Sequence, residues 1–303
     1  MENRRDFNRN GTPAGCGVKA VVLDWAGTTV DFGCVAPAAV FVDVFRKEGV
    51  EITMEEARGP MGLAKKDHIR VLCRAESIRA RWNATHGKAP GEEDVEGLHS
   101  SFTLALNSSI LNHSDLIPGT LEFVAALRKR GIKIGSTTGY SAETMEILLE
   151  DSRKRGYEPD ALVSPDEVPA GRPYPWMCYT NAIKLEAYPM RGMVKIGDTV
   201  ADIQEGLNAG MWTVGLAKSG NEIGLTMGEL LLMDPQEFRR RLEAAYGRLR
   251  ETGAHYVVDG IWDCLGVIDD IDERLKRGLS PLEVRQNTCT GEPARNGRGR
   301  YAG

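Results

Sequence analysis

The chain has 303 residues, 42% of them hydrophobic, and a formal net charge of -5. Because a single core stops growing at roughly 250 to 300 residues, this length predicts a main domain with an inserted or appended second unit. The acidic balance disfavours binding of nucleic acid over an extended surface, which needs a basic field.

Both ends of the chain are polar. Residues 1–17 contain no apolar run of the leader-peptide type, and residues 284–303 are polar and Gly-rich, so we expect two disordered tails. The basic C-terminal tail could also contact nucleic acid, but a solvated tail is the favoured interpretation. No run reaches the ~20 apolar residues that cross a bilayer. The six cysteines lack metal-ligand spacing. We therefore predict a cytoplasmic protein with reduced thiols and with no membrane or nucleic-acid partner.

Strand patterns and helix patterns alternate over residues 18–33 and 114–283, which we take as the core. Short β-branched runs end near Asp24, Thr138, Ser164, Asp198, Gly215 and Asp259. Amphipathic segments such as TLEFVAALRKRG and TMEILLEDSRKRG lie between them, each with a glycine as its stop signal. Strand followed by helix, repeated, predicts an α/β fold with a doubly wound, Rossmann-like parallel sheet.

Residues 34–113 interrupt this alternation, because they show consecutive helical patterns and no convincing strand. We predict an all-helical cap inserted between the first strand and the rest of the core. The cap would close over the sheet about hinges near residues 31–34 and 113–118. We expect a homodimer contact on apolar helical runs of the cap, such as AAVFVDVF at residues 38–45.

Reactive side chains stand at the predicted strand ends. Asp24, Thr138 and Asp198 follow the first, second and fourth strands, and Arg172 lies in the loop after the third. Taken singly, each is explained as a helix cap, a turn former or a surface cation. Ligands of open parallel sheets, however, bind beyond the carboxyl ends of the strands. Together these residues supply a nucleophile, a metal ligand, a hydroxyl and a cation, as phosphoryl transfer requires.

The segment DWAGTT at residues 24–29 and the segment GDTVAD at 197–202 resemble the haloacid dehalogenase superfamily. The resemblance implies that Asp24 attacks phosphorus and that Mg²⁺ is held by Asp24, Asp198 and the backbone carbonyl of Ala26. Asp202 is either a further ligand or a support behind the ligands. Gly27 lets the loop turn tightly under the phosphate.

Ala26 departs from the superfamily pattern, since most of its phosphatases carry an aspartate at that position. Without this acid an alkoxide leaving group lacks its proton donor, which disfavours a plain phosphomonoesterase or a sugar phosphate mutase. The carbon–halogen cleavers of the superfamily need no metal, whereas this chain has the full GDTVAD segment. A group other than an alkoxide must therefore leave the phosphorus.

The cap offers two adjacent lysines in the segment RGPMGLAKKDHIR at residues 58–70. A lysine made neutral by burial and a neighbouring ammonium can form an imine with an aldehyde. Helical spacing places Lys65 on a face with Met61 and His68, whereas Lys66 points with Arg70. Taken in isolation, adjacent lysines on a helix are more often a solvated face.

Five motifs narrow the resemblance to the phosphonoacetaldehyde hydrolase family: DWAGTTVDFG at 24–33, PMGLAKKDH at 60–68, GSTTGY at 135–140, VPAGRPYPWMCY at 168–179 and GDTVAD at 197–202. The likeness extends from about Val18 to about Ile271. It implies cleavage of the phosphorus–carbon bond of phosphonoacetaldehyde to acetaldehyde and phosphate, in the degradation of 2-aminoethylphosphonate. Lys65 would form the Schiff base, although Lys66 beside it leaves this assignment open.

The same resemblance implies that substrate or phosphate is bound by Gly27, Cys34, Met61, Gly62, His68, Thr138, Gly139, Tyr140 and Arg172. His68 and Tyr140 are candidates for activating water or for protonating the enamine carbon. Cys34 and Met61 are equally consistent with an ordinary place in the core of the cap.

Two other functions fit parts of the sequence. The first is a Mg²⁺-dependent phosphatase of small organic phosphates, which would be indifferent to replacement of Lys65. The second is a nucleotide-binding module, suggested by GTPAGCGVK at residues 11–19. This segment lacks the glycine spacing of a P-loop, and its strand follows where a P-loop strand precedes.

Overall fold

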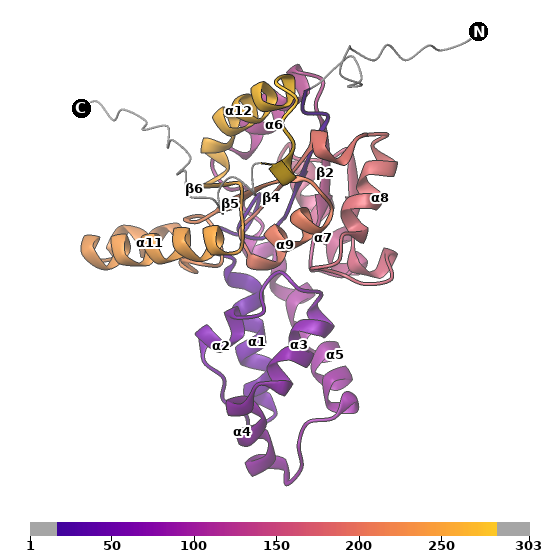
Figure 1. Ribbon diagram of the computed structural model, residues 1–303. Coiled ribbons are helices and arrows are strands. Elements are labelled where there is room, and N and C mark those ends of the chain that lie inside the picture. Colours follow the sequence, from indigo (N-terminus) through magenta and orange to yellow (C-terminus); the bar gives the residue numbers. More distant parts are fainter. Residues whose placement is uncertain (1–16, 284–303) are drawn as a thin grey trace.

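A parallel sheet with the strand order β3-β2-β1-β4-β5-β6 lies at the centre of the computed structural model, which describes residues 17–283 (Figure 1). Its strands are β1 (Ala20–Leu23), β2 (Lys133–Thr137), β3 (Ala161–Val163), β4 (Met193–Gly197), β5 (Trp212–Leu216) and β6 (Tyr256–Val258). Each predicted strand is confirmed. The predictions for the tails, and for most of GTPAGCGVK, lie outside the described residues.

Helices cover both faces of the sheet, as the doubly wound prediction requires. The core helices are α6 (Thr120–Lys129), α7 (Ala142–Lys154), α8 (Trp176–Lys184), α9 (Val200–Asn208), α10 (Met227–Leu232), α11 (Pro235–Glu251) and α12 (Cys264–Lys276). Because side chains alternate along a strand, Val21 and Leu23 join the apolar cluster that contains residues of α6, α7 and α12. Ala20 and Val22 join a second cluster with Cys178 of α8.

The segment between β1 and α6 is helical, and Figure 1 shows its helices grouped beyond one edge of the sheet. They are α1 (Val35–Lys47), α2 (Met54–Arg58), α3 (Lys65–Arg74), α4 (Glu76–His86) and α5 (Glu92–Ser109), followed by a 3-10 turn at Ile110–His113. The prediction of a strand-free helical insert is confirmed for these residues. The sequence of residues 60–87 predicts one uninterrupted helical pattern, but the extended backbone of Ala75 separates α3 from α4.

The two connections between cap and core run side by side. Val30 forms an antiparallel bridge with Leu116, and the Asp31 N–H donates to the Asp115 carbonyl at 3.2 Å. The Asp31 carboxylate accepts from the backbone N–H groups of Val35 and Ala36, each at 3.0 Å, and so caps α1. These are the segments in which we predict the hinges.

The run at residues 38–45 does not offer its apolar side chains to a second copy of the chain. Ala38, Phe41 and Phe45 have no exposed surface, because α1 packs against α2 and α5 inside the cap. The prediction that this run carries the homodimer contact is therefore wrong for these side chains.

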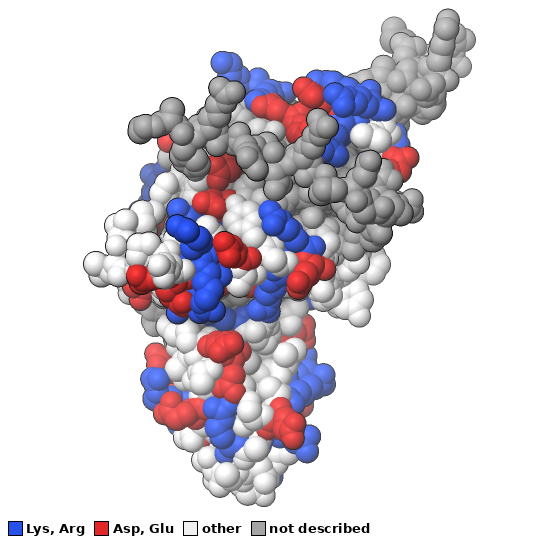
Figure 2. Space-filling model, turned by 60° about the vertical axis from the view of Figure 1, so that its left-hand side comes forward, with Lys and Arg blue, Asp and Glu red and all other residues white. Residues whose placement is uncertain are grey.

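Other predictions from composition concern surface and thiols. Within residues 17–283, no helix combines the length and apolar character that a membrane crossing requires. Acidic and basic side chains are interspersed over the face shown in Figure 2. The cysteines that the structure describes, Cys34, Cys73, Cys178 and Cys264, are free and buried.

Candidate active site

Three buried carboxylates meet at the carboxyl edge of the sheet. Strands β1 and β4 are neighbours with Leu23 paired to Ile196, so Asp24 and Asp198 leave the same edge. Asp202 joins them from the first turn of α9. One oxygen of each of the three carboxylates lies within 4.8 Å of the others. The structure therefore brings together the three acids that the sequence singled out.

Backbone and hydroxyl groups hold Asp198 in place. Its carboxylate accepts from the Thr28 hydroxyl at 3.3 Å and from the Asn221 N–H at 2.8 Å. Gly27 lies against it with a φ of +85°, and a Cβ at Gly27 would stand 2.3 Å from Asp198 Oδ2. A glycine is required here both for the left-handed backbone and for the close approach of the carboxylate.

The electrostatics of the triad fit a divalent cation. Burial, and then the neighbouring carboxylates, raise the pKa of Asp24 and of Asp198. Burial also acts to raise the pKa of Asp202, but Arg172 and Lys195 outweigh it and lower that pKa. A cation among the three acids would relieve their repulsion, and oxygen ligands of this kind suit Mg²⁺.

Arg172 connects the nucleophile candidate to the cap. Its guanidinium is buried and donates from Nη2 to Asp24 Oδ1 at 2.7 Å. From Nη1 it donates to the Gly62 carbonyl of the cap at 3.2 Å. Arg172, the cation that the sequence predicts for this site, therefore contacts Asp24, the predicted nucleophile. Thr138 is also buried, and its hydroxyl accepts from the Tyr140 N–H at 3.1 Å.

The cap loop at residues 60–64 rests on the core beside this arginine. A Cβ at Gly62 would lie 2.2 Å from Thr199 Oγ1. A Cβ at Gly139 would lie 2.5 Å from the Leu63 carbonyl oxygen. Two glycines, one from the cap and one from the core, thus let the backbones approach closely enough to enclose the site.

Of the two adjacent lysines, only Lys65 lies in this enclosed space. Its Nζ is 3.9 Å from Met61 Sδ and 4.8 Å from the centroid of the Tyr140 ring. Burial lowers the pKa of Lys65, although nearby Cys34 and Asp24 act to raise it. Lys66 is instead partly exposed and forms an ion pair with Glu96. The contact with Met61 comes from the turn before α3 and not from helical spacing, since α3 begins at Lys65.

His68 and Tyr140 are both buried, with one unpaired polar atom each. His68 Nε2 is 2.9 Å from the Ala57 carbonyl, and burial and the charge of Lys65 lower the pKa of His68 well below its usual value. The neutral ring therefore donates from Nε2 and leaves Nδ1 unprotonated. Among the described residues, neither His68 Nδ1 nor the Tyr140 hydroxyl has a hydrogen-bond partner. Burial raises the pKa of Tyr140 and of Cys34, so both stay protonated.

The sequence reasoning missed three residues behind the site. Thr137, Lys195 and Glu205 are buried and bond to one another, and Thr137 and Glu205 also bond to Arg172. The sequence does single out Lys195, because it is a charged residue inside the otherwise apolar strand MVKIG. Glu205 follows Asp202 by three residues and so lies on the same face of α9.

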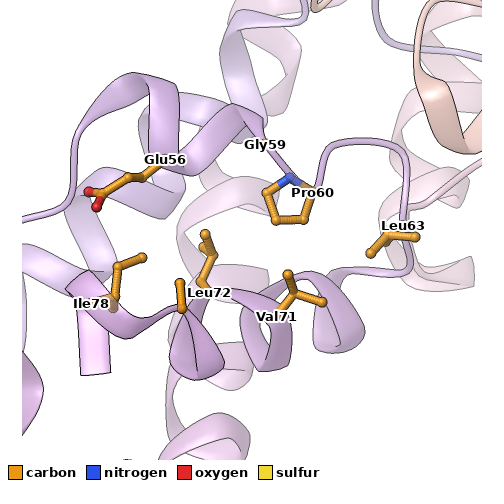
Figure 3. A pocket seen from close by; sticks show the side chains of 8 residues that line it. Glu56, Gly59, Pro60, Leu63, Val71, Leu72 and Ile78 are labelled. Atoms are coloured by element: carbon orange, nitrogen blue, oxygen red, sulfur yellow. The ribbon is translucent and has the colours of Figure 1, made fainter. Parts of the chain in front are cut away.

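A cavity of about 340 Å³ lies elsewhere, within the cap (Figure 3). Its lining includes Pro60, Leu63, Val71, Leu72 and Ile78, from the loop after α2 and from α3 and α4. None of the predicted site residues lines it. This cavity is distinct from the carboxylate site.

Comparisons with known proteins agree with this geometry. Residues 18–210 match the family model of haloacid dehalogenase-like hydrolases. The chain is 55% identical to a phosphonoacetaldehyde hydrolase-like protein of Syntrophobacter fumaroxidans, over 87% of this chain and 95% of that protein. It is 51% identical to a phosphonoacetaldehyde hydrolase of Nitratidesulfovibrio vulgaris, over 87% of this chain and 94% of that protein.

A solved structure is also similar along most of the chain. The crystal structure of a phosphonoacetaldehyde hydrolase-like protein from Oleispira antarctica superposes with a TM-score of 0.85 at 41% identity. The match covers 87% of this chain and 96% of that one. The likeness therefore includes both the α/β core and the helical insert.

Proposed function

The chain belongs to the phosphonoacetaldehyde hydrolases, within the haloacid dehalogenase-like hydrolases, and on this basis we propose that it cleaves the phosphorus–carbon bond of phosphonoacetaldehyde. The products are acetaldehyde and phosphate, and the reaction belongs to the degradation of 2-aminoethylphosphonate. The meeting of Lys65 from the cap with Asp24 and Arg172 from the core carries this proposal. An amine for the aldehyde and a carboxylate for the phosphorus are the two nucleophiles that such a substrate needs.

Lys65 acts first, as the nucleophile for the aldehyde. Because burial lowers its pKa, a larger fraction of the side chain is the free amine at neutral pH. The amine adds to the carbonyl carbon, and loss of water leaves a protonated imine. His68 Nδ1 and the Tyr140 hydroxyl are the candidates for the proton transfers, one as acceptor and the other as donor.

Asp24 then takes the phosphoryl group. Its carboxylate attacks phosphorus in line, the phosphorus–carbon bond breaks, and its electron pair moves into the protonated imine to give an enamine. The leaving atom is carbon, which explains why Ala26 can stand where related phosphatases carry an acid. Water hydrolyses the aspartyl phosphate. Protonation of the enamine and hydrolysis of the imine release acetaldehyde and free Lys65.

The carboxylates suit a metal ion in this reaction. Asp24, Asp198 and the backbone carbonyl of Ala26 would hold Mg²⁺. Asp202 would stand behind these ligands, because the Asp202 oxygens face Arg172, Lys195 and Thr199. When bound, Mg²⁺ supplies positive charge that offsets the negative charge of the phosphonate.

The remaining residues divide between the two ends of the substrate. We propose that the phosphonate group is bound by Gly27, Thr138, Gly139 and Arg172. The aldehyde end would be lined by Cys34, Met61, Gly62, His68 and Tyr140, which are buried around Lys65 or adjoin it.

Two further expectations stay part of the proposal. One is a homodimer formed through the cap, on side chains other than the buried ones of α1; Leu104 of α5 is 74% exposed and Val71 of α3 is 43% exposed. A monomeric mass in sedimentation at micromolar protein would contradict it. The other is a cytoplasmic location, which cell fractionation would test.

The experiment that tests the function is a product assay. Phosphonoacetaldehyde and Mg²⁺ should yield acetaldehyde and phosphate together, in equal amounts, and borohydride added with acetaldehyde should inactivate the enzyme by reducing the imine. Borohydride alone is the control. Ready hydrolysis of generic phosphate esters, with no acetaldehyde from the phosphonate, would support the phosphatase alternative instead.

A further inference from the structure

A buried charged layer lies beneath Arg172, on the side away from the cap. It consists of Lys195 on β4 and Glu205 on α9, with the Thr137 hydroxyl at the end of β2 between them. Neither Lys195 nor Glu205 has any exposed surface. Placing two charges in the interior is costly unless their arrangement is well satisfied, so this pair calls for an explanation beyond folding alone.

One oxygen of Glu205 contacts Arg172 and both other members of this layer. Glu205 Oε2 accepts from Arg172 Nε at 3.0 Å and from the Thr137 hydroxyl at 3.0 Å, and it lies 3.4 Å from Lys195 Nζ. Glu205 Oε1 has no hydrogen-bond partner within the described part of the chain. The carboxylate is thus aimed at the Nε edge of the guanidinium.

Holding the Nε edge fixes where the rest of the guanidinium points. Because the group is planar, a carboxylate at Nε restricts rotation and directs the two terminal nitrogens toward the site. Those nitrogens meet Asp24 at 2.7 Å, the Gly62 carbonyl at 3.2 Å and Asp202 at 3.1 Å. Glu205 therefore orients the cation without touching the nucleophile.

Lys195 balances the charge around this arginine. Arg172 forms ion pairs with the carboxylates of Asp24, Asp202 and Glu205, and Lys195 contacts two of these carboxylates, those of Asp202 and Glu205. Lys195 Nζ lies 2.8 Å from Asp202 and donates to the Thr137 hydroxyl at 2.9 Å. The lysine thereby shares Asp202 with Arg172 and leaves more of the arginine's charge for an incoming anion.

We propose that Glu205 and Lys195 are positioning residues that hold Arg172 ready to bind the phosphoryl group. The inference deepens the proposed function, since it concerns the phosphonate end of the same site. It assigns no part in the aldehyde chemistry to either residue. Binding of phosphate and imine formation at Lys65 should therefore respond differently to changes in this layer.

The test uses inorganic phosphate as the probe, with binding measured by calorimetry in the presence of Mg²⁺. Glu205→Gln keeps the size of the side chain but removes its charge, and should weaken phosphate binding about tenfold, as expected for loss of a charged hydrogen bond. Borohydride trapping of acetaldehyde on Lys65 should stay unchanged. Glu150→Gln, which removes an exposed ion pair on α7, is the matched control and should leave both unchanged.

Chemical rescue separates positioning from a merely structural role. Arg172→Ala should regain phosphate binding when guanidinium is added, because Glu205 anchors the added cation. Arg172→Ala/Glu205→Gln should need about tenfold more guanidinium for the same recovery. Equal rescue of the two variants, or unchanged phosphate affinity in Glu205→Gln, would overturn the proposal.

A second variant tests the proposal if Glu205→Gln does not fold. Lys195→Met/Glu205→Gln removes both charges and leaves no unpaired charge in the layer, so it should fold and still bind phosphate about tenfold more weakly. Wild-type affinity in this variant would also overturn the proposal. Absence of any borohydride adduct in the wild-type enzyme would contradict the proposed function instead, and calorimetry would still decide the role of this layer.

Discussion

Two glycines of the cap allow the closed site to be tested by a matched pair of substitutions. Gly62 and Gly87 both adopt a left-handed backbone, with φ of +93° and +71°. A Cβ at Gly62 would lie 2.2 Å from Thr199 Oγ1, whereas a Cβ at Gly87 would meet nothing within 4 Å. Gly62→Ala should therefore prevent the cap loop from resting on the core, and Gly87→Ala should not.

The size of the effect follows from these distances. Alanine in a left-handed conformation costs about 1–2 kcal/mol, so this part of the stability loss should be similar in both variants. To restore an ordinary contact of about 3.5 Å, the loop or Thr199 must also move by about 1 Å in Gly62→Ala. Misplacement by about 1 Å near reacting groups costs about 100-fold in rate. We expect kcat/KM to fall about 100-fold in Gly62→Ala and less than about twofold in Gly87→Ala.

The assay couples acetaldehyde formation to an alcohol dehydrogenase and follows NADH, and thermal unfolding of both variants supplies the stability control. Thr199 also caps α9 and bonds to Asp202, so movement of Thr199 would disturb the metal-ligand candidates as well. Wild-type kcat/KM in Gly62→Ala, with the same loss of stability as Gly87→Ala, would refute the role given to this close approach.

Three other changes should have distinct outcomes. Lys65→Arg should lose nearly all turnover and borohydride trapping, because a guanidinium is not a nucleophile at neutral pH. Lys66→Arg should keep both. Peptide mass analysis that finds the borohydride adduct on Lys66 would contradict the assignment of the imine to Lys65. Asp198→Ala should abolish turnover or sharply raise the Mg²⁺ concentration needed, and wild-type activity that survives EDTA would argue against a metal. Burial raises the pKa of Asp31 from 3.8 to about 6, so the folded state binds this proton more tightly than the unfolded state and stability falls as pH rises between these values. Relative to Asp31→Asn, urea unfolding should show wild type losing about 2 kcal/mol between pH 4 and pH 6, and parallel pH profiles would contradict this.

The sheet and its carboxyl edge could be predicted because the signals are local. Strand β4 is an apolar run that ends where Asp198 begins, and the helix after it starts with a Thr199–Asp202 capping box. The carboxyl ends of parallel strands lie at one edge of the sheet, so the fold class alone predicts that Asp24 and Asp198 lie close together. The break between α3 and α4 was missed because Ala75 carries no helix-stop signal.

The layer around Glu205 could not be predicted, because its members come from β2, β4, α9 and the loop after β3. In sequence, Lys195 is a charged residue within an apolar strand, and Glu205 is one of many helical glutamates. The pairing of β1 with β2 and β4 brings Thr137 and Lys195 to the two strands beside β1, and the contacts of Glu205 from α9 join both to Arg172. Their separation from Lys65 has a chemical consequence. In the proposed mechanism the buried ionic layer of the core orients Arg172 for the phosphoryl group, while the cap supplies the amine of Lys65, so variants in the layer and variants at Lys65 should affect different steps of the reaction.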